Sequence, residues 1–161
     1  MRHVLALTLV AALVLTLSPG AALASHYAIS DVPRLVTPAQ VEKLHKANVN
    51  TTEELLDKAA KAKDRKALAK ASKLPAAELL DLARRCDLLR IKGVGSEMVL
   101  LFEAAGVKST SELVKQEAPA LMTAVTAANG KAKITEKPPT EPQLADWIGQ
   151  AKKLPQVVES K

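Results

Sequence analysis

Apolar residues along this chain recur every three or four positions, which is the spacing of one face of an α-helix. Val41, Leu44 and Ala47 form one such face. Residues 37–40 (TPAQ) precede it with an N-cap threonine, a proline at the first helical position and a glutamine at the third. Residues 51–54 (TTEE) carry a second start signal of this kind. The pattern therefore predicts an all-α protein, a compact bundle of about seven to nine short helices.

The same pattern occurs twice. Shifted by 58 positions, residues 36–55 meet the same or similar residue types at 94–113, and shifted by 65, residues 79–89 meet 144–154. The sequence thus predicts a first unit over residues 25–89, a second unit over 90–155 and a tail over 156–161. Neither unit buries its apolar face alone, so we expect the two to pack into one domain.

The helical faces also predict which side chains form the common core. Cys86, the one cysteine, falls on such a face, which favours a packing role over a disulfide or a nucleophile. Trp147 also falls on a helical face, which favours packing over ligand binding. The residues expected in the core are Val41, Leu44, Val49, Leu55, Leu79, Leu82, Cys86, Ile91, Val94, Val99, Phe102, Val107, Leu113, Leu144, Trp147 and Ile148.

The first 24 residues have the pattern of a secretory signal peptide. Arg2 supplies a positive start, residues 4–17 are largely apolar, and residues 22–24 (ALA) fit the small-x-small rule of signal peptidase. We expect cleavage after Ala24 and, after it, an exported bacterial protein in the periplasm or outside the cell, without a transmembrane segment.

The positive charge of the chain, +6 in total, is concentrated in one segment. Residues 57–73 hold seven basic residues and two aspartates. This segment is a candidate surface for polyanions such as nucleic acid or an acidic envelope polymer. The alternative is the solvated side of surface helices whose apolar stripe is Leu56, Ala60, Ala67 and Ala71. The basic residues are Lys58, Lys61, Lys63, Arg65, Lys66, Lys70 and Lys73.

A glycine turn supplies a second candidate. Residues 87–97 read DLLRIKGVGSE, followed by AAGV at 104–107, SELV at 111–114 and ADWIGQAKKL at 145–154. Here the chain resembles the helix-hairpin-helix superfamily, and within it a bacterial family of uncharacterised domains. The resemblance implies two tandem helix-hairpin-helix-like units, and a hairpin whose main-chain amides hold phosphate in DNA-binding members. Candidate phosphate-binding residues are Arg90, Lys92, Gly93, Gly95 and Ser96.

Two features disfavour DNA as the partner. The corresponding turn of the first unit, residues 34–37 (RLVT), has no glycine. Glu97 lies in the first turn of the helix after the hairpin, where its carboxylate would repel a phosphate. If Gly95 holds a positive φ, its replacement by alanine should lower stability.

No catalytic group of residues is evident, and neither His26 nor His45 has a second ligand at metal-binding spacing. We therefore expect no enzyme, no metal and no cofactor. The sequence favours an exported helical interaction or structural module, whose partner is a protein or an anionic envelope polymer. The alternative is non-specific binding of double-stranded DNA or another polyanion.

Overall fold

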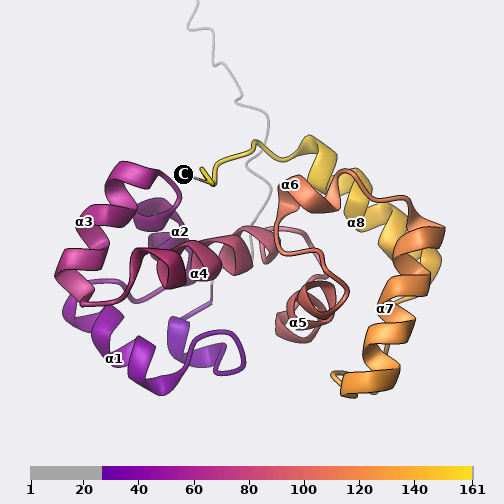
Figure 1. Ribbon diagram of the computed structural model, residues 1–161, viewed down its shortest axis with the longest axis horizontal. Helices are drawn as coiled ribbons and strands as arrows, with labels where there is room; N and C mark the ends of the chain where they lie inside the picture. The colour runs from indigo at the N-terminus through magenta and orange to yellow at the C-terminus, as the bar shows by residue number, and fades with distance from the viewer. Residues whose placement is uncertain (1–26, 161) are drawn as a thin grey trace, which may run out of the picture.

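The computed structural model describes residues 27–160, and this part of the chain is all-α, as predicted (Figure 1). Apart from the helices it contains one isolated β-bridge, between Ala28 and Thr51. The predicted signal peptide, residues 1–24, lies outside the described residues. The elements are η1 (Ile29–Asp31), α1 (Pro38–Lys46), α2 (Thr52–Ala59), α3 (Ala62–Ser72), α4 (Ala76–Leu88), α5 (Ser96–Ala104), α6 (Thr110–Leu113), α7 (Ala118–Ala132) and α8 (Glu141–Lys153).

Helix α4 runs through the middle of the molecule, with α1–α3 on one side and α5–α8 on the other (Figure 1). Helices α2 and α3 pack on each other and on α4, and α7 packs on α5 and α8. The short helix α6 contacts both α4 and α8, so it joins the two sides. No helix within the described residues is long and apolar enough to cross a membrane.

One hydrophobic core extends across both sides. At its centre, the ring of Phe102 meets the ring of Trp147 edge to face, with centroids 5.9 Å apart and an interplanar angle of 83°. The predicted core residues are buried, Cys86 and Trp147 included, with the exception of Val41. Val41 is half-buried: it packs against the core and also borders a hollow lined by Pro33, Val36 and Pro38.

The start signals in the sequence act as expected. Thr37 and Gln40 form a capping box at α1, and Thr140 and Gln143 form one at α8. At α2, the Thr51 hydroxyl accepts a hydrogen bond from the Glu54 N–H. The Glu54 carboxylate in turn accepts from the Asn50 N–H at 2.7 Å, and this bond is the main cause of its lowered pKa. These bonds satisfy amides that a helix start leaves without intrahelical partners.

The prediction of an apolar stripe through residues 56–71 is wrong for the last two of its four residues. Leu56 and Ala60 are buried, whereas Ala67 and Ala71 are exposed. Helix α2 ends at Ala59 and α3 begins at Ala62, so the helical phase changes between them. The face of α3 that turns inward therefore carries Arg65, Leu68 and Ser72.

Candidate functional site

The glycine turn joins the end of α4 to the start of α5. Gly93 has a φ of +91°, which favours glycine, and the buried Val94 donates its N–H to the Ile91 carbonyl at 3.0 Å. Gly95 is the N-cap of α5 and has extended backbone angles, φ −98° and ψ −176°. Gly93, rather than Gly95, is therefore the residue whose backbone conformation requires glycine.

Helix α8 holds this turn in place. The Gln150 side chain accepts a hydrogen bond from the Lys92 N–H at 2.9 Å and donates one to the Lys92 carbonyl at 3.2 Å. A Cβ added to Gly93 would lie 3.0 Å from the Trp147 Nε1 atom. The main-chain amide of Lys92 is therefore hydrogen-bonded within the protein, and only the lysine side chain extends into solvent.

Arg90, the other cation proposed for phosphate, is also engaged. Its guanidinium donates to the Asp87 carboxylate at 2.6 Å and to the Pro155 carbonyl at 3.3 Å. Asp87 is itself buried and accepts a second hydrogen bond from the Thr110 hydroxyl. Arg90 thus compensates a buried carboxylate. Ser96, at the first position of α5, is half-buried.

Glu97 is held next to the start of α5 by residues that are distant in sequence. Arg34 donates to its carboxylate at 3.0 Å and the Thr135 hydroxyl donates at 2.7 Å. Arg34 belongs to the turn before α1, so this ion pair connects the two sides of the molecule. The contact keeps a carboxylate next to the amides that a phosphate would approach.

Replacing Gly93 by alanine is expected to lower the free energy of unfolding by about 1–3 kcal/mol, because alanine resists the positive φ and its Cβ meets Trp147. Gly95→Ala is the matched control. Its Cβ would meet nothing within 4 Å, and we expect a loss below about 1 kcal/mol. Urea unfolding of both variants measures the difference. Equal losses would contradict the assignment of the strained position to Gly93.

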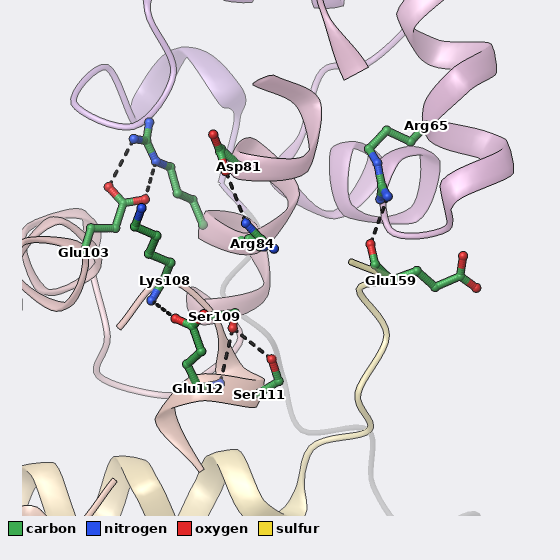
Figure 2. A network of polar contacts seen from close by, with 10 residues as sticks. Arg65, Asp81, Arg84, Glu103, Lys108, Ser109, Ser111, Glu112 and Glu159 are labelled. Carbon is green, nitrogen blue, oxygen red and sulfur yellow. Dashed lines mark hydrogen bonds and ion pairs between the residues drawn. The ribbon is translucent and has the colours of Figure 1, made fainter. Parts of the chain in front are cut away.

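The basic segment 57–73 divides into two groups. Arg65 is 4% exposed, so it cannot belong to an exposed patch as the sequence suggested. Its guanidinium donates to the carbonyls of Ala59 at 2.7 Å, Ala60 at 3.0 Å and Glu159 at 2.9 Å. Figure 2 shows the last of these bonds, between α3 and the C-terminal segment. Arg65 is therefore a structural residue.

The remaining lysines are exposed, and three of them, Lys63, Lys66 and Lys70, share one side of α3. Their spacing of three and four residues places them on one face, away from the buried Arg65, Leu68 and Ser72, and Lys73 follows at the C-cap of the helix. We call this group the basic face. Lys58 lies elsewhere and donates to the Asn48 carbonyl at 2.6 Å, and Lys61 is the N-cap of α3. The basic face consists of Lys63, Lys66, Lys70 and Lys73.

An ion pair that sequence reasoning missed joins α4 to α5. The Arg85 guanidinium contacts both carboxylate oxygens of Glu103, at 2.7 and 3.1 Å, and donates to the Leu35 carbonyl at 2.7 Å. Figure 2 shows Glu103 within this polar region, close to the Asp81–Arg84 pair. Because the partners lie on different helices, no spacing in the sequence marks them. Arg85 therefore connects three segments, namely α4, α5 and the turn before α1.

Cys86, the next residue of α4, is buried. Burial, together with the negative charge of Asp87, raises the pKa of its thiol to about 12. A thiol of this kind remains protonated near neutral pH and is a poor nucleophile. Within residues 27–160, no group of three or more His, Cys, Asp and Glu side chains is arranged to hold a metal ion.

Residues 34–154 match a protein family described as "Domain of unknown function (DUF4332)". The chain belongs to this family. The match begins in the turn before α1, includes every α-helix up to Leu154, and thus covers the glycine turn and the basic face. No curated protein and no solved structure matches the chain.

Proposed function

We propose that this protein is an exported, non-enzymatic helical interaction module. The proposal rests on one observation: the side chains that could be reactive are paired or buried. Glu103 is paired with Arg85, Asp87 accepts from Arg90 and Thr110, and the Cys86 thiol is buried with a raised pKa. Groups that could act as acids, bases or nucleophiles thus stabilise contacts between helices.

We propose further that the fold is a tandem pair of helix-hairpin-helix-like units. Helices α1 and α5 have equal lengths and begin 58 residues apart, and α2 and α6 begin at the same separation. In each unit, the residue after the C-cap of the first helix has a positive φ, Asn48 at 55° and Gly106 at 87°. These parallels support duplication of one unit. In this view, Arg34 and Arg85 connect the two units, through Glu97 and Glu103 respectively.

The N-terminal signal, with its expected cleavage after Ala24, supports export to the bacterial periplasm or beyond. The intact mass of the exported protein tests this step, because cleavage would make Ser25 the first residue.

A second candidate function is non-specific polyanion binding, and the basic face favours it. Three exposed lysines on one side of α3 and a fourth at its C-cap give a concentrated positive potential without an acidic residue between them on that face. The glycine turn is the weaker site, because Glu97 lies next to it and the Lys92 amide is bonded to Gln150. Double-stranded DNA and acidic envelope polymers present the same repeated negative charge, and both are candidate ligands.

The binding candidate is tested by titrating the mature protein with duplex DNA and with an acidic polysaccharide at several salt concentrations. If the basic face binds, the double variant Lys66→Ala/Lys70→Ala should weaken binding to either polymer. For DNA, the slope of log affinity against log salt should decrease by about two, since two phosphate contacts are lost. Lys92→Ala should leave affinity and slope unchanged.

The Lys92→Ala variant also identifies the competing site. If it alone weakened DNA binding and lowered the salt slope by about one, the hairpin would be the phosphate site and the basic face would be refuted. Absence of binding to both polymers at low salt would reject the second candidate and leave an interaction with a protein.

A further inference from the structure

Residues 155–160 leave the end of α8 and run back across the molecule to the junction between α2 and α3 (Figure 1). We call this segment the C-terminal strap. It is not helical, and Val157 and Val158 are half-buried against the core. Pro155, Gln156 and Glu159 are exposed. The strap thus lies on the surface of the helices as an extended peptide does.

Glu159 makes three hydrogen bonds to the junction. Its N–H donates to the Ala60 carbonyl at 2.9 Å, and its carbonyl accepts from Arg65 at 2.9 Å. Its carboxylate accepts from the Ala62 N–H at 2.9 Å. Main chain and side chain of one residue are therefore both recognised. Figure 2 shows the bond between Arg65 and the Glu159 carbonyl.

The start of α3 has no side-chain cap from its own N-cap residue, and Glu159 supplies one. Ala62 is the first residue of α3, and its N-cap, Lys61, provides no side-chain hydrogen bond. The Glu159 carboxylate acts as the cap from 97 residues away and places negative charge at the positive end of the helix. Arg65, fixed by the Ala59 and Ala60 carbonyls, directs its remaining donor group at the strap. This geometry recognises an acidic residue in an extended segment.

A groove of about 660 Å³ lies between the strap and α2. Leu56 and Ala60 contribute apolar surface from the helix side, and Val157 and Val158 contribute it from the strap. The strap therefore fills only part of the surface available to an extended peptide. The lining also includes the charged residues Asp57, Lys61 and Asp64, so only the part at Leu56 and Ala60 suits the apolar side chains that precede the acidic residue.

We propose that the α2–α3 junction is a peptide-binding site and that the C-terminal strap is its resident ligand. The site takes an extended segment in which two apolar residues precede a glutamate. Because the strap is tethered, it competes at an effective concentration in the millimolar range and keeps the site largely occupied. Because the strap has no helical hydrogen bonds and Pro155, Gln156 and Glu159 are exposed, a peptide of the same pattern from another chain can displace it. The site is separate from the basic face, so it does not rest on polyanion binding.

The test uses the full chain and a fluorescently labelled peptide of residues 154–160 (LPQVVES) with an amidated end. Binding is followed by fluorescence anisotropy. Glu159→Ala removes the cap supplied by the strap, so the site should be open more often. A cap contributes about a fivefold change in equilibrium, so the apparent dissociation constant of the peptide should be about fivefold lower for the variant than for the wild type.

Two controls separate recognition from non-specific adhesion. Glu136→Ala removes an exposed carboxylate far from the strap in sequence, and it should bind the peptide as the wild type does. A peptide in which alanine replaces the glutamate should bind the Glu159→Ala protein at least fivefold more weakly than the original peptide. Amide exchange at Ala62 should be faster in Glu159→Ala than in the wild type.

The proposal is overturned if the peptide has the same affinity for Glu159→Ala and the wild type, or does not bind the variant at millimolar concentration. Equal affinity of the two peptides for the variant would also overturn it, because the carboxylate would then not be recognised. Unchanged exchange at Ala62 would show that the strap does not cap α3 in solution.

Discussion

Replacing Phe102 by alanine is expected to lower the free energy of unfolding by about 3–5 kcal/mol. The ring is fully buried, at 0% exposure, and it meets Trp147 edge to face. Truncation removes this apolar surface and leaves a cavity between α5 and α8 that surrounding helices only partly fill. Urea unfolding followed by fluorescence measures the loss, and Trp147, the one tryptophan in the chain, is the probe.

Two variants separate the contributions to this loss. Phe102→Leu retains most of the buried volume and removes the aromatic contact, which is worth about 0.5–1.5 kcal/mol beyond burial. Leu100→Ala truncates a half-buried side chain on the same helix and should cost clearly less than Phe102→Ala. A loss below about 1 kcal/mol for Phe102→Ala would show that the assigned core face of α5 is wrong.

Features that depend on neighbours in the sequence were predictable. The helical period placed Leu44 and Phe102 in the core, and the start of α1 follows from its capping box. These features are local, because a cap and a face are each set within about one or two turns of helix. The left-handed conformation of Asn48, just after α1, is local in the same sense, because asparagine tolerates a positive φ.

Two features of the candidate sites required the structure. A basic residue in a lysine-rich segment suggests solvent exposure, but Arg65 is buried because a break between α2 and α3 turns it inward. Its third carbonyl comes from Glu159, which lies 94 residues further along the chain. The sequence also could not distinguish the two glycines of the turn, since only the backbone angles show which one has a positive φ, and only the position of Trp147 shows which one lacks room for a Cβ.

The second large effect is expected at Arg65. Arg65→Met retains an unbranched apolar stem but removes every guanidinium donor, so the Ala59 carbonyl loses its partner and the Ala60 carbonyl keeps only the bond from the Glu159 N–H. A buried acceptor left without a hydrogen bond costs about 1–3 kcal/mol. Glu159 loses one of its bonds as well, but this part of the strap can turn to water. We therefore expect a loss of about 2–4 kcal/mol in the free energy of unfolding, measured by urea titration.

The matched control is Lys66→Met, the same change of charge at the next residue of α3. Lys66 is exposed on the basic face, so this variant should stay within about 0.5 kcal/mol of the wild type. Both variants lose one positive charge, so a difference between their free energies of unfolding cannot come from the net charge. If Arg65→Met cost no more than Lys66→Met, the guanidinium would not satisfy buried carbonyls in solution. Arg65 would then be an exposed cation like the neighbouring lysines, and the strap would lack the hydrogen bond from Arg65 to the Glu159 carbonyl.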